Sequence, residues 1–243
     1  MRFLKPIGTD CADAVQLAGV SAADSACTGK WTYRFRPDSW LPTADANLLL
    51  CQRASLEAKK RNYTAAIVLL NKLVAYDADN AEHYANRGLM HYHVRQWAQA
   101  LCDYNRAIEL DPALDKTFNN RANLHARQAN WIDAIADYDT AIDLNPLNIR
   151  ARLNQGITFC EMCDYDAAID CLDIALFFRP NSASLYAERG RVYHLQGDWN
   201  CAIADYTRAT QLTRNLDSSD FTAPSLVSRR VRQWMNSLIH TIS

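Results

Sequence analysis

The stretch AIDLNP, residues 141–146, recurs along the chain and decides its fold. Similar phrases stand at 107–112, AIELDP, and at 175–180, ALFFRP, so Pro112, Pro146 and Pro180 lie 34 residues apart. A proline ends a helix because its nitrogen has no hydrogen to donate and its ring collides with the preceding turn. A period of this length predicts a chain of repeated units, each of which is one small supersecondary motif.

Counting back from the prolines gives units at 81–114, 115–148 and 149–182, with a fourth at 183–216 that lacks the proline. A weaker copy at 47–80 has Ala78 in the proline's place, so five units are predicted. The shared positions include Trp97, Trp131, Tyr165 and Trp199; Ala100, Ala134, Ala168 and Ala202; and Tyr104, Tyr138, Leu172 and Tyr206.

Each unit has the pattern of two helices joined by a short turn. In the last unit Tyr186, Gly190 and Tyr193 lie at helical spacing, and QGDW at 196–199 then interrupts the chain. The second helix alternates alanine with a large apolar residue at spacings of three and four. Small residues allow the two helices to approach closely, and the aromatic residue fills the space beside them.

These residues resemble the tetratricopeptide repeat family, whose unit is a 34-residue helix-turn-helix with large, small and aromatic residues at these places. The resemblance covers 47–216. It implies an all-α solenoid, a right-handed superhelix of stacked units, that acts as a non-enzymatic scaffold or assembly adaptor.

Two segments lie outside the repeats. Residues 217–243 begin with a polar linker and continue with Val227, Val231, Trp234, Leu238 and Ile242 on one helical stripe, which predicts a capping helix over the open end of the stack. Residues 1–46 include KWTYRFRP, 30–37, whose alternation predicts an extended or irregular segment. That segment is expected either to pack on the first repeat or to occupy the groove.

Composition argues against several classes of protein. The 26 basic and 27 acidic residues give a net charge of -1, so no overall field attracts nucleic acid or an anionic membrane. No apolar run reaches the ~18 residues of a membrane span. Asp10 and Asp13 interrupt the apolar region that a signal peptide would need. Eight cysteines without framework spacing are typical of free thiols in a reducing, cytoplasmic compartment.

A repeated arginine is interpreted as structural. Arg87, Arg121 and Arg189 take the seventh place of their units, and Asp103, Asp137 and Asp205 take one place of the second helix. In the unit 149–182, Gln155 and Cys171 replace both members together. This joint loss predicts an ion pair between the two helices of a unit; Arg53, whose unit has Leu69 at the second place, is the exception.

The family resemblance implies that the first helices line a concave groove that binds a peptide. The predicted groove residues are Asn86, Tyr92, Lys116, Asn119, Asn120, Asn123, Arg127, Arg150, Asn154 and Arg191. Asn86, Asn120 and Asn154 repeat at one position, where an amide can both donate to and accept from a peptide bond. The basic residues favour an acidic ligand or a free C-terminal carboxylate.

A standard chaperone-tail clamp is not expected, since Asn119, Ser184 and Glu188 stand where that clamp needs positive charges. Two alternatives remain open. One is binding of nucleic acid or an anionic surface through Arg229, Arg230 and Arg232, and the other is self-association through the aromatic N-terminal segment.

No cofactor, metal or catalytic residue is predicted. Cys160 and Cys163 have metal-like spacing, but a structural zinc site commonly needs a second such pair. His91 and His125 share a position with Phe159 and Tyr193, which favours packing over catalysis.

Overall fold

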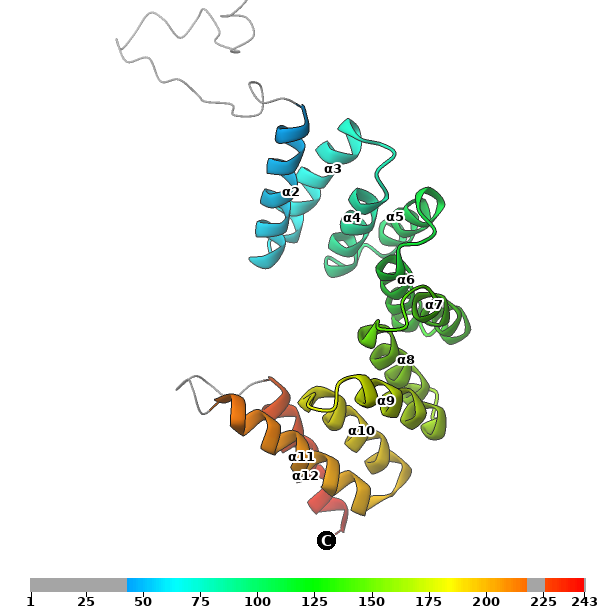
Figure 1. Cartoon of the computed structure of the whole chain (residues 1–243), viewed down its shortest axis with the longest axis vertical. Coiled ribbons are helices and arrows are strands. Elements are labelled where there is room, and N and C mark those ends of the chain that lie inside the picture. Colours follow the sequence, from blue (N-terminus) through cyan, green and yellow to red (C-terminus); the bar gives the residue numbers. More distant parts are fainter. Residues whose placement is uncertain (1–42, 218–225, 243) are drawn as a thin grey trace, which may run out of the picture. The chain divides into compact units, whose positions relative to one another are not determined.

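The structure is a computed structural model that describes residues 43–217 and 226–242, most of them in helices. The packing considered below lies within residues 51–243. The helices follow one another as shown in Figure 1: α2 Thr43–Lys59, α3 Tyr63–Tyr76, α4 Ala81–His93, α5 Trp97–Leu110, α6 Asp115–Arg127, α7 Trp131–Leu144, α8 Ile149–Glu161, α9 Tyr165–Phe178, α10 Ala183–Gln196, α11 Trp199–Asp217 and α12 Leu226–Ile242.

This architecture confirms the predicted all-α solenoid. No strand occurs within the described ranges, and the helices pair as α4 with α5, α6 with α7, α8 with α9 and α10 with α11. The first helices α4, α6, α8 and α10 also contact one another in that order. The aromatic segment predicted at 30–37 lies outside the described residues, and α2 begins at Thr43.

The prolines act as the sequence predicts. The helices α5, α7 and α9 end two residues before Pro112, Pro146 and Pro180, and the residue before each proline has left the helical conformation, with φ of -143°, -142° and -135°. The ring of a proline disfavours helical backbone in the residue before it. Where Arg214 replaces the proline, α11 continues to Asp217 and is 19 residues long instead of 14.

Close approach of the paired helices depends on small residues. Ala100, Ala134, Ala168 and Ala202 are fully buried. A Cβ added to Gly88 would lie 2.8 Å from the ring of Tyr104. The aromatic ring therefore occupies the space that the missing side chain leaves, and the same packing recurs between Gly190 and Tyr206.

The turn between the two helices of each unit uses a left-handed residue. Arg61, Arg95, Ala129, Cys163 and Gly197 have φ of 61°, 62°, 60°, 63° and 94°, again at intervals of 34 residues. A left-handed residue just after a helix allows the last carbonyls to find amide donors. Cys163 therefore lies in the interhelical turn.

The helix α12 covers the end of the repeat stack, which confirms the predicted capping helix. It packs against α10 and α11. Val231 is buried with Ala187, Tyr206 and Ala209, and the rings of Tyr206 and Trp234 are 6.1 Å apart. The side chains of Leu238 and Ile242 lie outside the described residues. Among the helices that the structure describes, none combines the length and apolar character that crossing a membrane requires.

Candidate functional site: the face of the first helices

The repeated arginines are structural, which confirms the sequence interpretation. Arg121 donates from Nε and Nη2 to the two carboxylate oxygens of Asp137, at 2.8 and 2.7 Å. Its Nη1 donates to Asn105 Oδ1 on the preceding second helix, at 2.8 Å. One guanidinium thus joins three helices of two consecutive units. The same three-way contact recurs at Arg87 with Asp103 and Asn71, and at Arg189 with Asp205 and Asp173.

In the unit 149–182, the neutral Gln155 replaces the arginine and still connects its helix to two neighbouring second helices. Gln155 Nε2 donates to Asp139 Oδ1 at 2.7 Å, and the thiol of Cys171 donates to Gln155 Oε1 at 3.4 Å. Burial raises the pKa of Cys171 to about 11, so the group remains a neutral thiol at physiological pH. The polar groups of these residues bond to one another inside the repeat stack, so the exposed residues of the first helices are the better candidates for binding a ligand.

The residues at positions 2, 6, 9 and 13 of a unit form one stripe along its first helix, which we call the first-helix stripe. On α6 the stripe is Lys116, Asn120, Asn123 and Arg127, at helical spacings of four, three and four. On α4 it is Glu82, Asn86, Leu89 and His93, and on α8 it is Arg150, Asn154, Ile157 and Glu161.

Asn119 is not on this stripe. It is only 4% exposed, and its side chain connects α8 to α6. Asn154 Nδ2 donates to Asn119 Oδ1 at 3.0 Å, and Asn119 Nδ2 donates to Asn120 Oδ1 at 3.4 Å. Within the described residues, the Nδ2 group of Asn120 and the Oδ1 atom of Asn154 have no partner. The buried amide of Asn119 thereby orients the two stripe amides in opposite senses. Asn120 presents its NH2 group as a donor, and Asn154 presents its Oδ1 atom as an acceptor.

Two more of the predicted groove residues have partners inside the protein. Asn123 accepts a hydrogen bond from the hydroxyl of the buried Tyr138 at 2.7 Å. Tyr92 packs edge-on against Trp97, with ring centroids 5.4 Å apart. Both side chains remain half-buried on the first-helix face.

Three cations of the stripe are exposed. Lys116, Arg127 and Arg150 form no ion pair with any residue in the part of the chain that the structure describes. Lys116 and Arg150 occupy the same position of consecutive units, four residues before Asn120 and Asn154. The stripes of α6 and α8 therefore carry positive charge beside the two oriented amides.

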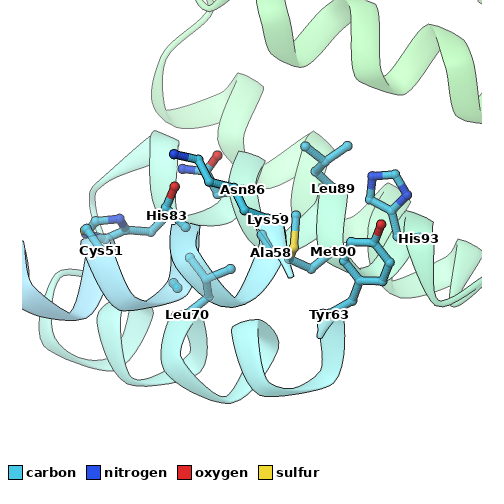
Figure 2. A pocket seen from close by; sticks show the side chains of 12 residues that line it. Cys51, Ala58, Lys59, Tyr63, Leu70, His83, Asn86, Leu89, Met90 and His93 are labelled. Carbon is cyan, nitrogen blue, oxygen red and sulfur yellow. The ribbon is translucent and has the colours of Figure 1, made fainter. Parts of the chain in front are cut away.

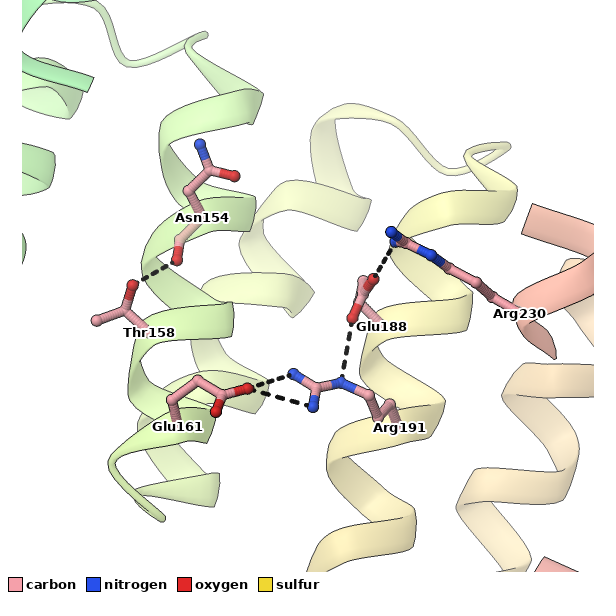
Figure 3. A network of polar contacts seen from close by, with 6 residues as sticks. All are labelled: Asn154, Thr158, Glu161, Glu188, Arg191 and Arg230. Carbon is pink, nitrogen blue, oxygen red and sulfur yellow. Dashed lines mark hydrogen bonds and ion pairs between the residues drawn. The ribbon is translucent and has the colours of Figure 1, made fainter. Parts of the chain in front are cut away.

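Arg191 differs from these cations because it is already paired (Figure 3). Its guanidinium lies 3.4 Å from Glu161 Oε1 and 3.3 Å from Glu188 Oε2, and Arg230 of α12 lies 3.5 Å from Glu188 Oε1. Burial raises the pKa of Glu188, although Arg191 and Arg230 act in the opposite direction. On α10 the place of the stripe asparagine is thus taken by an ion-paired glutamate connected to α12.

A cavity of about 410 Å³ opens beside Asn86, between α2, α3 and α4 (Figure 2). Its lining is mostly apolar and comprises Cys51, Ala54, Ser55, Ala58, Lys59, Tyr63, Leu70, His83, Asn86, Leu89, Met90 and His93. The rings of Tyr63 and His93 stack at one side with centroids 4.5 Å apart. Of the ten groove residues predicted above, Asn86 is the one that lines this cavity. The repeat pattern does not predict the cavity, because its shape depends on how individual side chains pack.

The two cysteines with metal-like spacing differ in their surroundings. Cys160 is buried on α8, whereas Cys163 is exposed in the turn. Within the described ranges, the structure brings together no group of three or more His, Cys, Asp or Glu residues that could hold a metal ion. His91 and His125 are half-buried, each with Nε2 3.9 Å from the aspartate of an Arg–Asp pair.

Comparison with known families agrees with this architecture. The sequence profile described as tetratricopeptide repeat matches residues 51–115, 119–160 and 161–216. The chain belongs to the tetratricopeptide repeat family. A search of curated proteins gave no significant match.

Several solved tetratricopeptide repeat structures have the same fold. A crystal structure of MamA protein is 18% identical, with a TM-score of 0.59 over 73% of this chain and 96% of that one. MamA from Desulfovibrio magneticus, from residue 41 to its end, is 13% identical, with a TM-score of 0.62 over 70% and 97%. YrrB, described as a tetratricopeptide repeat protein with an unusual peptide-binding site, is 16% identical, with a TM-score of 0.54 over 68% and 85%.

Proposed function

We propose that this protein is a non-enzymatic scaffold that binds an extended segment of a partner protein across the first-helix stripes of α4, α6 and α8. The observation that carries the proposal is the orientation of the two stripe amides by buried Asn119. Asn120 offers a donor to a ligand carbonyl, and Asn154 offers an acceptor to a ligand amide. This pair suits a peptide backbone, whatever the side chains of the ligand.

The spacing of the repeats supports an extended ligand. Packed helices lie about 8–10 Å apart, and a strand advances about 3.3 Å per residue. The asparagines of neighbouring units would therefore meet roughly every third residue of the ligand. The first helices that carry them are direct neighbours.

Charge and shape define the partner further. Lys116, Arg127 and Arg150 favour acidic side chains or a terminal carboxylate over α6 and α8. The cavity beside Asn86 is large enough for one apolar side chain at the α4 end of the ligand. We therefore expect an acidic segment with one large apolar residue. Arg191 is not included in this set, because Glu161 and Glu188 already neutralise it.

Partner capture with the full chain tests this proposal. We expect Asn120→Ala/Asn154→Ala to weaken capture of the partner by about thirtyfold, since the variant loses two neutral hydrogen bonds that contribute about 1 kcal/mol each. Captured proteins are quantified by mass spectrometry, and affinity is then measured by fluorescence anisotropy with a peptide from the partner.

The matched control is Asn181→Ala/Asn200→Ala, which removes two exposed amides that lie away from the stripe. Circular dichroism should show unchanged helicity in both variants. Equal capture by wild type and Asn120→Ala/Asn154→Ala would contradict the groove as the binding site. The alternative through the basic final helix would use Arg229, Arg230 and Arg232, all of which are exposed, and it predicts a steep loss of binding with salt.

A further inference from the structure

The second helix α9 carries an exposed apolar patch that the proposed function does not use. Ile174, Phe177 and Phe178 are 44%, 82% and 41% exposed, and their spacing of three and four places them on one face. The two phenylalanine rings meet edge to face with centroids 5.4 Å apart. We call these three side chains the α9 patch.

The repeat fold does not require apolar residues at the places of Ile174 and Phe177, whereas leucine stands at the place of Phe178 in the other three units. In the corresponding places, α5 has Arg106 and Glu109, which form an ion pair at 3.1 Å. The pairs at the same two places are Thr140 and Asp143 in α7, and Arg208 and Gln211 in α11. Only α9 among these helices replaces both polar residues with large apolar ones. Adjacent exposed apolar side chains of this kind are typical of a contact surface.

Two charges at the ends of the patch have no ion-pair partner within the described ranges. Asp170 lies one turn before Ile174, and Arg179 directly follows Phe178. Neither forms an ion pair with a residue in the described part of the chain, whereas Asp166 binds Gln196 and Asp173 binds Arg189. The α9 patch thus has a free negative charge at one end and a free positive charge at the other.

We propose that α9 is the contact between two copies of this chain, packed antiparallel about a two-fold axis. In that arrangement Ile174 of one copy faces Phe177 of the other, so that the apolar side chains cover each other. Asp170 then lies near Arg179 of the second copy, and the symmetry forms this pair twice. A parallel arrangement would instead place like charges together.

The area of the patch sets the strength of the contact. A stable interface buries about 800 Å² on each partner, more than three side chains supply, so we expect a weak dimer that forms over about 5–500 μM. Sedimentation velocity of the full chain over this range should show the dimer fraction rising with concentration. A wild type that remains monomeric throughout would overturn the proposal.

A paired substitution tests the patch itself. Ile174→Arg/Phe177→Glu gives α9 the residues that α5 already carries at these places, so the helix is expected to fold normally. We expect at least a tenfold increase in the dissociation constant of the dimer. The control Ile132→Asp changes an 84% exposed isoleucine of α7 to the residue that α9 has at that place, and should leave the dimer intact. A dimer that survives Ile174→Arg/Phe177→Glu forms through another surface and overturns the proposal.

Charge exchange tests the antiparallel arrangement. Asp170→Arg and Arg179→Asp should each weaken the dimer by about two- to fivefold, as expected for exposed ion pairs. Mixing the two variants should restore association, because both cross-pairs then have opposite charges. A mixture no stronger than either variant alone contradicts this register. Asn120→Ala/Asn154→Ala should not change sedimentation, which separates this proposal from the peptide site.

Discussion

Arg121 shows how one side chain can hold consecutive repeats together. Its guanidinium makes two parallel hydrogen bonds to Asp137 and a third to Asn105 of the preceding unit. It also lies over the ring of Phe118, with the guanidinium carbon 5.6 Å from the ring centre. A planar group with several fixed donors suits these simultaneous contacts, whereas a lysine ammonium is a point charge. The repeated arginine therefore belongs to the framework of the molecule.

A double-mutant cycle on this pair should show strong coupling. We expect Arg121→Ala and Asp137→Ala each to lower the free energy of unfolding by about 2–4 kcal/mol, because each leaves a largely buried charge unpaired. The double variant should lose less than the sum of the two. Urea denaturation measures all three variants, with Arg121→Lys as the control that keeps the charge but loses the two-pronged contact. Additive losses would refute the assigned ion pair.

At the scale of the element, the repeated unit depends on its turn. Five residues at equal intervals adopt the left-handed conformation, and only Gly197 among them is a glycine. A residue with a Cβ is strained in that conformation by roughly 1 kcal/mol or more. The fold tolerates this cost at four turns because the amides that follow bond the last carbonyls of the first helix, as Asn130 does with His125.

The turns can be exchanged to test this account. Ala129→Gly should raise the free energy of unfolding by about 0.5 kcal/mol, since relief of strain exceeds the greater freedom of glycine in the unfolded chain. Gly197→Ala should lower it by about 1 kcal/mol. Thermal and urea denaturation provide the measurement. Opposite signs for the two substitutions are the expected signature, and loss of stability in both would show that the backbone conformation is not the controlling factor.

At the scale of the whole molecule, α10, the first helix of the last unit, is connected to the capping helix α12 by ion pairs. Glu188 lies between Arg191 of its own helix and Arg230 of α12 (Figure 3). The same arginine reaches Glu161 at the end of α8. This network occupies the place where the row of stripe asparagines would continue, so the proposed peptide site ends at α8.

The buried Glu188 should make stability depend on pH. Burial holds its pKa in the folded protein above the ordinary value of 4.5. The folded state therefore binds the proton of the Glu188 carboxyl group more tightly than the unfolded state does. Protonation of Glu188 stabilises the fold below pH 4.5, and this stabilisation is lost as pH rises through the folded pKa. Glu188→Gln removes the titration. The free energy of unfolding of this variant, minus that of wild type, should increase from pH 4 to 7 in chemical denaturation. A difference that falls with pH would mean that Arg191 and Arg230 outweigh burial.

The prediction from sequence succeeds where contacts recur at fixed spacing. The 34-residue period identifies the helix pairs, and the joint loss of Arg and Asp at Gln155 and Cys171 predicts the ion pair between helices. The predicted groove is less sharply defined. Asn86, Lys116, Arg127 and Arg150 are exposed on the first helices, whereas Asn119 is buried and Arg191 is paired. Their binding roles remain predictions.

The period, the helix pairs and the side chains shared by the units follow from the amino-acid sequence alone, because local spacing encodes which residues lie on each helical face. Other features depend on the distances between neighbouring units and on the shapes of packed side chains. Tertiary structure alone decides that Asn119 orients Asn120 and Asn154, that a cavity opens beside Asn86, and that Phe177 is left exposed. The same position of the repeat can thus hold a side chain that packs inside the fold in one unit and a side chain that is exposed in the next.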